Sequence, residues 1–393
     1  MRICGIKKLT LNQEKLNKIR VFVAKYKDAD LHSLLLKKSP FPEVSMQELV
    51  QQIKGRKVAE KKFPFLNQEN IIFPPNLNLE QASSQDTADF KKQLFKGRKF
   101  IDLTCGFGID AYFLSQNFEE ITLIEQNTEL LDIVKHNWEV LGRKANFINQ
   151  KLEDFLKNNK EKFDLIYLDP ARRDNHNRKV FLLEDLSPNI IEIQEQLSNI
   201  STEVLIKLSP LIDIQHLVAS LKNIHKIWII AVKNEVKEVL VYLKKTENQP
   251  EISCINLQSS EPEFHFNLDD EKYCQSELSF PKKYIYIPNN SVLKSGAFNL
   301  VSEKFGLKKL HQNTHIYTSE EKIEHFPGRI FETEEINSKA IKKGEQFNII
   351  TKNFPLKPEE IKKKYKIKDG GNQYLIAVKS ISGNHFLVGK LLD

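Results

Sequence analysis

The sequence has few cysteines and no long apolar run. Its four cysteines, Cys4, Cys105, Cys254 and Cys274, lie far apart in 393 residues and form no C-x-x-C pair. Neither a zinc site nor a disulfide framework is therefore expected. The first thirty residues hold no apolar stretch long enough for a signal peptide or a membrane span, and no later stretch reaches that length without charges. These absences favour a reduced, cytoplasmic setting.

The positive charge of the chain is concentrated near its end. The formal net charge is +7, yet the residues from Pro281 onward hold 20 Lys and Arg against 12 Asp and Glu. This part therefore carries about +8, and everything before it about −1. The asymmetry has two interpretations: a module that binds a polyanion, or a lysine-rich surface that is only solvated.

The chain divides into a helical start and a long α/β stretch. Residues 1 to about 80 show apolar residues at helical spacings, for example Leu16, Ile19 and Val23. From about 97 to 245, helical stretches alternate with apolar strand candidates at 99–103, 121–124, 145–148, 163–168, 204–208, 226–232 and 236–243. Such alternation predicts a doubly wound parallel sheet. The last two candidates are so close that we expect an antiparallel hairpin, which would give the seven-stranded sheet of class I methyltransferases.

A glycine turn follows the first of these strands. The stretch "DLTCGFG" places Asp102 at the strand end and Thr104, Gly106 and Gly108 in the turn, and Glu125 closes the next strand. Glycines let the backbone approach a ligand, and an acid at the second strand tip can accept both hydroxyls of a ribose. These features suit NAD and S-adenosylmethionine equally, and the match alone is weak. Asp102 favours S-adenosylmethionine, because a carboxylate would repel a pyrophosphate but attract an ammonium and a sulfonium.

Two further segments flank this turn. Downstream, "FDLIYLDPARRD" is an apolar strand that ends in Asp169-Pro170, where class I methyltransferases contact the methyl acceptor. Upstream, "SSQDTAD" precedes a helix, with Ser84 and Thr87 three residues apart. This segment has two interpretations, which are compatible: a plain helix N-cap, or the segment that covers the cofactor in nucleic-acid methyltransferases.

Taken together, these motifs resemble a family of bacterial class I S-adenosylmethionine-dependent methyltransferases with a THUMP-like C-terminal domain. The resemblance also rests on "KLSP" at 207–210, "VKNEVKEVL" at 232–240, "LKSGAF" at 293–298, "FPGR" at 326–329 and "DGGNQYL" at 369–375. It implies a helical part over 1–80, a Rossmann-like methyltransferase domain over 81–246, a ferredoxin-like domain over 278–321 and a THUMP-like domain over 322–393. The core is distantly similar to cap guanine-N2 methyltransferases. THUMP domains bind RNA, so the resemblance implies an RNA-modifying enzyme.

Two residues depart from the family pattern. Cys105 stands where another glycine is expected, which is tolerable if its φ stays negative. More seriously, enzymes that methylate exocyclic amines usually carry Asn/Asp-Pro-Pro and an aromatic that stacks on a flipped base, whereas Ala171 and Arg172 occupy those places here. Arg172 could stack through its guanidinium plane or hold a phosphate or carboxylate, so the acceptor atom stays open.

Roles for individual residues follow from these positions. We expect Asp169 to accept one N–H of an acceptor amine and the Pro170 carbonyl the second, which would aim the nitrogen lone pair at the methyl group. Leu152, through its backbone, should contact the adenine after the third strand, with Asn149 and Gln150 as alternatives. The residues expected to bind substrate are Arg172, Arg173, Lys207, Asn234 and Arg329, with a simple turn role as the alternative for Asn234. The lysine run at 362–368 is a further candidate for RNA contact, with a solvated helix face as its alternative. For Lys207 the alternatives are a phosphate contact, ordering of the Asp169 loop, or a lysine that merely reaches solvent.

Four functions remain open on the sequence. The first is an RNA methyltransferase that acts on a base nitrogen. The second is a methyltransferase for a protein or small molecule, with Arg172 and Arg173 gripping a carboxylate. A non-catalytic RNA-binding protein is disfavoured, because Asp102, Glu125 and Asp169 occur together with both glycines. Redox chemistry with NAD is disfavoured by Asp102 and by the terminal hairpin.

Overall fold

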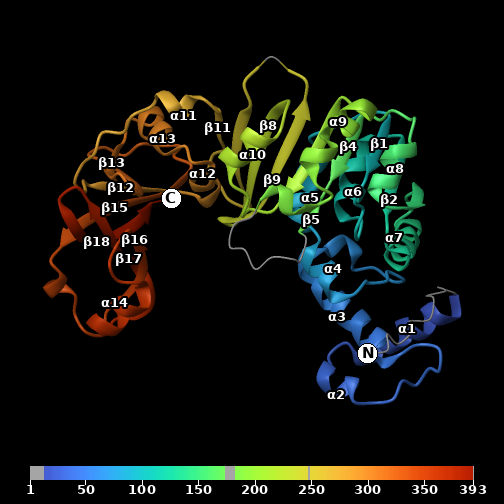
Figure 1. The fold of residues 1–393 in the computed structure, drawn as a ribbon. Helices are drawn as coiled ribbons and strands as arrows, with labels where there is room; N and C mark the ends of the chain where they lie inside the picture. The colour runs from blue at the N-terminus through green and yellow to red at the C-terminus, as the bar shows by residue number, and fades with distance from the viewer. Residues whose placement is uncertain (1–12, 173–181, 247, 393) are drawn as a thin grey trace. The chain divides into compact units, whose positions relative to one another are not determined.

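The computed structural model describes residues 13–172, 182–246 and 248–392 (Figure 1). The chain folds into two compact units, one of Met1–Asn223 with Tyr242–Lys245 and the other of Ile224–Val241 with Thr246–Asp393. In the described ranges, no helix is long and apolar enough to cross a membrane.

The first unit begins with helices, as the apolar spacing predicts. They are α1 (Gln13–Tyr26), α2 (Leu31–Leu35), α3 (Met46–Lys62), the 3-10 turn η1 (Pro64–Leu66) and α4 (Asn76–Gln81). Ser45 begins α3 with a capping box in which its side chain accepts from the Glu48 N–H and the Glu48 side chain accepts from Ser45. Gly55 lets α3 approach the following chain, because a Cβ there would lie 2.2 Å from the Cβ of Phe73.

A parallel sheet forms the centre of the first unit. Its strands pair in the order β7-β4-β1-β2-β3, all parallel. Their bounds are β1 (Lys99–Asp102), β2 (Glu120–Glu125), β3 (Asn146–Asn149), β4 (Leu165–Leu168) and β7 (Glu203–Leu208). Each lies within two residues of the predicted strand. Since the strands are parallel, Asp102, Glu125 and the residues after Leu168 and Leu208 meet at one edge of the sheet.

Helices connect these strands and bury their apolar faces against them. They are α5 (Gln85–Lys92), α6 (Ile109–Leu114), η2 (Ser115–Asn117), α7 (Thr128–Val140), α8 (Leu152–Asn158), η3 (Leu183–Asp185), α9 (Ile190–Ile200) and α10 (Ile214–Ser220). The short strands β5 (Ala171–Arg172) and β6 (Leu186–Ser187) form a separate antiparallel pair. Figure 1 shows α6, α7, α8 and α9 around β1, β2 and β4. The predicted α/β class is confirmed.

The second unit begins with the predicted hairpin. Strands β8 (Ile224–Val232) and β9 (Glu235–Lys244) are neighbours joined by Lys233 and Asn234, whose φ values are 49° and 65°. Two positive φ values in a two-residue loop are typical of a type I′ turn between antiparallel strands. Next come β10 (Glu251–Leu257), parallel to β8, and β11 (Phe264–Asn267), antiparallel to β10. The polar stretch near 246–280 is therefore β-rich, and it adds two strands to the seven that were expected.

The rest of the second unit is a single seven-stranded sheet in the order β13-β14-β12-β15-β18-β17-β16. Its strands are β12 (Tyr284–Pro288), β13 (Lys308–His311), β14 (Thr314–Ser319), β15 (Gly328–Ile336), β16 (Gln346–Lys352), β17 (Lys368–Ser380) and β18 (Gly383–Leu392). Its helices are α11 (Asp270–Tyr273), α12 (Asn290–Ser295), α13 (Phe298–Lys304), η4 (Ser338–Ala340) and α14 (Pro358–Tyr365). Strands β12 and β15 pair along Tyr284–Pro288 and Gly328–Glu332, so the two small domains expected here share one sheet.

Candidate active site

The loop from β1 to α6 carries an acid and two glycines. Asp102 ends β1 with 1% of its surface exposed, and its carboxylate accepts from the Thr104 N–H at 2.9 Å. Gly106 and Gly108 both have left-handed backbone, with φ of 54° and 74°. A Cβ on Gly106 would meet only the Thr104 carbonyl oxygen, at 3.8 Å, whereas one on Gly108 would lie 2.9 Å from Val134 Cγ1. Gly106 therefore borders open space, and Gly108 lets the loop pack against α7.

The Glu125 carboxylate at the end of β2 is held against this loop. Its Oε2 accepts from the Gly106 N–H at 3.0 Å, and its Oε1 accepts from the Asn127 N–H at 2.8 Å. Each oxygen keeps a second lone pair that can accept from a ligand hydroxyl. The loop and the second strand tip thus form one hydrogen-bonded structure, with the acid in a fixed orientation.

Asp169 is held from two sides after β4. Its backbone N–H donates to Thr104 Oγ1 at 2.7 Å, which links it to the β1 loop. Its carboxylate Oδ2 lies 2.5 Å from the Lys207 ammonium on β7, and its side chain is 36% exposed. Of the alternatives for Lys207, the structure shows the contact that orders Asp169. Pro170 is buried and leads into β5.

Next to Asp169 lies a group of buried charges, of which only Lys207 was predicted from the sequence. We call Lys91, Asp110 and Lys207, with Ser83 and Tyr167, the buried charge cluster. Asp110 Oδ1 lies 2.9 Å from Lys91 Nζ, and Asp110 Oδ2 lies 3.1 Å from Lys207 Nζ. Asp110 Oδ2 also accepts from Ser83 Oγ and Tyr167 Oη, both at 2.7 Å, and Lys207 Nζ donates to Ser83 Oγ at 3.0 Å.

The three aspartates have different proton affinities. Burial raises the pKa of Asp102 well above its ordinary value, and the hydrogen bond from Thr104 opposes this only partly. Burial would raise the pKa of Asp110 as well, but the ammonium groups of Lys207 and Lys91 outweigh it and hold that pKa well below its usual range. Burial raises the pKa of Asp169, and Lys207 opposes the rise. The four carboxylates of this region, Asp102, Asp110, Glu125 and Asp169, outnumber the two ammonium groups, which pair with Asp110 and Asp169.

The other predicted cofactor residues occupy structural positions. The Ser84 hydroxyl caps α5, accepting from the Thr87 N–H at 3.5 Å, and the buried Thr87 hydroxyl donates to the Ser84 carbonyl at 3.2 Å. This agrees with the N-cap interpretation. Leu152 is buried and begins α8. The Asn149 amide accepts from Thr128 Oγ1 and donates to the carbonyls of Glu125 and Gln126, so Leu152 and Gln150 are the stronger candidates for the adenine contact.

The predicted substrate residues are distributed over both units. Asn234 lies in the β8–β9 turn of the second unit, where its side-chain oxygen accepts from the Asn290 N–H at 2.7 Å. Arg329, also in the second unit, lies over the Phe331 ring at 5.6 Å. The Arg172 backbone belongs to β5, while its side chain and the whole of Arg173 lie outside the described residues. Of the predicted substrate residues, Lys207 thus lies with Asp169 at the edge of the sheet, where the β1 loop and Glu125 also lie.

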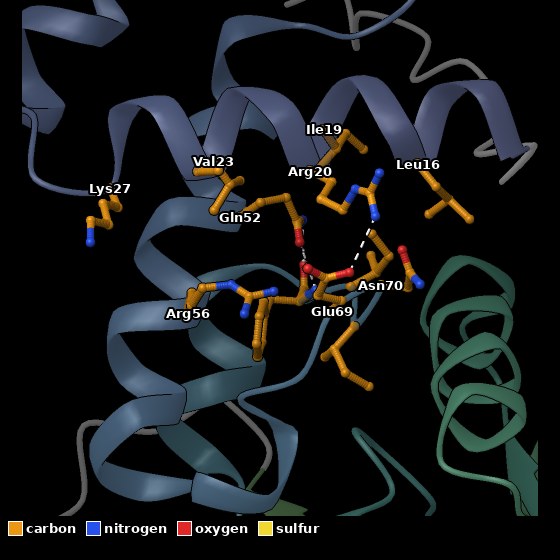
Figure 2. A pocket seen from close by; sticks show the side chains of 13 residues that line it. Leu16, Ile19, Arg20, Val23, Lys27, Gln52, Arg56, Glu69 and Asn70 are labelled. Atoms are coloured by element: carbon orange, nitrogen blue, oxygen red, sulfur yellow. Dashed lines mark hydrogen bonds and ion pairs between the residues drawn. The ribbon is translucent and has the colours of Figure 1, made fainter.

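A separate cavity of about 160 Å³ lies among the N-terminal helices, and none of its lining residues belongs to the sheet edge. Figure 2 shows it between α1 and the chain at Glu69–Asn70. Its arginines are already engaged, because Arg20 pairs with Glu69 at 3.2 Å and Arg56 donates to Asn67 and to the Gln68 carbonyl. The arginines of the cavity are therefore less available to a ligand than the carboxylates of the sheet edge are. Among the described residues, no group of three or more His, Cys, Asp or Glu is arranged to hold a metal ion.

Comparison with known proteins agrees with this architecture. Residues 284–327 match a ferredoxin-like domain family, residues 328–389 match a THUMP domain-like family, and residues 86–207 match a family described as conserved hypothetical protein 95. A Porphyromonas gingivalis W83 protein provisionally described as a methyltransferase is 28% identical, with a TM-score of 0.85, over 97% of this chain and 99% of its own. Nearly the whole chain is thus similar to a protein described as a methyltransferase, and its C-terminal part matches two domain families.

Other proteins match this chain over shorter stretches. An uncharacterized RNA methyltransferase of Mycoplasma mobile is 32% identical over 92 residues, which is 23% of this chain and 25% of the relative. The chain thus matches about a quarter of that relative's length. A Thermus thermophilus 16S rRNA N2 G1207 methyltransferase, solved with AdoMet and guanosine, is 14% identical over 44% of each chain, with a TM-score of 0.32. The family resemblance that the motifs indicated is confirmed.

Proposed function

We propose that the protein transfers the methyl group of S-adenosylmethionine to a base nitrogen in RNA. The observation that carries this proposal is the set of carboxylates at one edge of the sheet. Asp102, Glu125 and Asp169 follow three neighbouring strands, and each is held by a hydrogen bond or ion pair to a neighbour. These negatively charged groups would favour the binding of a cationic ligand.

The residues of the β1 loop and the β2 tip fit S-adenosylmethionine. This cofactor supplies a methyl group on a sulfonium, which is already activated for transfer. Glu125 has the lone pairs to accept both ribose hydroxyls, and the absent Cβ of Gly106 leaves space beside it. The Asp102 carboxylate favours the positive charge of the cofactor. The Leu152 or Gln150 backbone completes the proposed site on the side of the third strand.

Asp169 would hold the methyl acceptor. Its Oδ2 contacts Lys207, and the partial exposure of its side chain leaves Oδ1 able to accept an N–H from a base amine. The Pro170 carbonyl would accept the second N–H. Such positioning is worth up to roughly 7–11 kcal/mol of a reaction barrier, since the methyl donor brings its own driving force. We propose that Arg172 and Arg173 anchor the substrate beside it.

The second unit supports RNA as the substrate. It contains the basic stretch from residue 281 and the THUMP domain-like match, and the Mycoplasma mobile relative bears the name of an RNA methyltransferase. In α14, Lys362 is paired with Glu359 at 2.7 Å and also with Asp369. The exposed Lys363 and Lys364 are therefore better placed to contact phosphates than Lys362 is. Arg329 remains a proposed contact in the same unit.

The decisive experiment compares modified nucleosides in total RNA from a strain that lacks the gene and from its parent. Mass spectrometry should find one methylated nucleoside absent from the deletion strain, and a plasmid copy should restore it. A plasmid copy carrying Asp169→Ala should fail to restore it, although the variant still binds S-adenosylmethionine. An unchanged nucleoside profile would argue against RNA as the substrate.

A further inference from the structure

The buried charge cluster ends at the proposed acceptor residue. The exposed fraction of the side chain rises along it, from 0% for Lys91 through 8% for Asp110 and 10% for Lys207 to 36% for Asp169. The contacts follow the same order, with Lys91 on Asp110, Asp110 on Lys207, and Lys207 on Asp169. Three charged side chains inside the protein thus lead to one carboxylate at its surface.

Stability alone does not account for such an arrangement. Taking ions out of water is costly, and apolar residues of similar size often stabilise a protein as well or better. The positions of these residues also have no local origin, since Lys207 and Asp110 are 97 residues apart, and Lys207 and Ser83 are 124 apart. Among the described residues, the cluster reaches the edge of the sheet through the contact of Lys207 with Asp169.

We propose that Lys207 is a positioning residue, anchored by Asp110 and Ser83, that holds the Asp169 carboxylate ionised and aimed at the methyl acceptor. This inference rests on the proposed function. Oxygen atoms of three described residues contact Lys207 Nζ and help to fix it in place: Asp169 Oδ2 at 2.5 Å, Ser83 Oγ at 3.0 Å and Asp110 Oδ2 at 3.1 Å. Lys91 balances the second oxygen of Asp110, which allows Asp110 to remain charged.

An ionised Asp169 requires a methyl acceptor whose nitrogen bears a hydrogen. An ionised carboxylate can only accept hydrogen bonds, so Asp169 suits a neutral amine or amide that presents an N–H. Its charge also depends on the groups that face it. These are Lys207 on β7, Lys91 on α5, Asp110 on α6 and Asp102 on β1. The two lysines favour the charged form, and burial with the two aspartates disfavours it.

The test measures the titration of Asp169 directly in the full-length protein. Carboxyl carbon NMR of aspartate-labelled protein is recorded across the acidic to neutral pH range, and the Asp169→Asn variant identifies the signal. Lys207→Met should move the midpoint of the Asp169 titration to higher pH, and Lys207→Arg should largely preserve it. Lys91→Met is the matched control, because it also removes a buried cation from Asp110, whereas the ion pair with Asp169 is made by Lys207. It should move the midpoint much less.

A kinetic measurement connects this titration with turnover. The acidic limb of the profile of kcat/KM against pH should move to higher pH in Lys207→Met. Below the midpoint, kcat/KM should fall about tenfold for every pH unit by which the limb moves. Affinity for S-adenosylmethionine, measured by calorimetry, should stay the same. The NMR titration can be measured whether or not the protein methylates RNA. A wild type that binds no S-adenosylmethionine would therefore refute the proposed function, but it would leave the effect of Lys207 on Asp169 open to measurement.

Two results would overturn the inference. One is a Lys207→Met protein whose Asp169 midpoint moves no more than that of Lys91→Met. The other is a loss of turnover in Lys207→Met with an unchanged pH profile, as a merely structural lysine would give. If Lys207→Met does not fold, the side-chain nitrogen signal of Lys207 is compared between wild type and Asp169→Asn. A displaced signal supports the contact, and an unchanged one contradicts it.

Discussion

Replacing Gly108 with alanine should destabilise the first unit severely. The residue has φ of 74°, and alanine in left-handed backbone costs about 1–2 kcal/mol. The new Cβ would also lie 2.9 Å from Val134 Cγ1 and 3.2 Å from Trp138 Nε1, both on α7. Overpacking of this kind costs typically ~1–3 kcal/mol. The free energy of unfolding should therefore fall by roughly 2–5 kcal/mol, a large part of the ~5–15 kcal/mol that most proteins have.

Gly142→Ala provides the matched control. Gly142 has nearly the same φ, 71°, but nothing lies within 4 Å of the added Cβ. It should therefore cost only the backbone term of about 1–2 kcal/mol. The difference between the two variants isolates the packing of the loop against α7.

Urea unfolding followed by tryptophan fluorescence measures both variants. The chain has two tryptophans, Trp138 in the first unit and Trp228 in the second. A Trp228→Phe background makes Trp138 the reporter of the unit that contains both glycines. Equal midpoints for Gly108→Ala and Gly142→Ala would refute the packing argument, because only Gly108 has close neighbours.

Four further variants test the site. Gly106→Ala should lower stability no more than Gly142→Ala, because its Cβ meets only the Thr104 carbonyl, yet calorimetry should show a large loss of S-adenosylmethionine affinity. Glu125→Ala should abolish that affinity, since the ribose loses its acceptor, while circular dichroism stays unchanged. Asp110→Asn should destabilise the protein at neutral pH by about 3–5 kcal/mol, because it leaves two buried lysines without their shared partner. Asp102→Asn should instead stabilise it at neutral pH, in unfolding experiments without ligand.

At neutral pH the two aspartate variants should differ from wild type in opposite directions, Asp110→Asn being less stable and Asp102→Asn more stable. The pKa of Asp110 is lowered in the folded protein, so its contribution is present above the ordinary aspartate pKa and lost as pH falls through the lower folded value. The pKa of Asp102 is raised, so its ionisation weakens the folded state as pH rises above the ordinary value. The stability difference from wild type should therefore shrink towards acid pH for both variants. A difference of the same sign for both at neutral pH would contradict the assignment, as would unchanged affinity in Glu125→Ala or Gly106→Ala.

The sequence predicted the sheet well because its signals are local. Each central strand is a short apolar run, and the Lys233-Asn234 turn lies between two such runs, so period and spacing suffice. The ends of parallel strands then bring Asp102, Glu125 and Asp169 to one edge without further information.

The buried charge cluster could not be predicted in the same way. Asp110 lies in the first turn of α6, where an acid is ordinary, and Lys91 lies in the last turn of α5, where a lysine is ordinary. Their pairing depends on how two helices and β7 pack, which no local pattern records. The only signals were Ser83 before the helix cap and Lys207 inside an otherwise apolar strand. The sequence likewise predicted two separate C-terminal domains. It gave no sign that β12 of the first pairs with β15 of the second.

The pairing of β12 with β15 limits how this part of the chain can be divided. A chain that ended between Ser319 and Gly328 would leave β12 without its partner on one side, and the remaining fragment would expose the matching side of β15. Unpaired strand edges of this kind invite association with other chains. Recombination between genes should therefore exchange the ferredoxin-like and THUMP-like segments together, although they match two separate families.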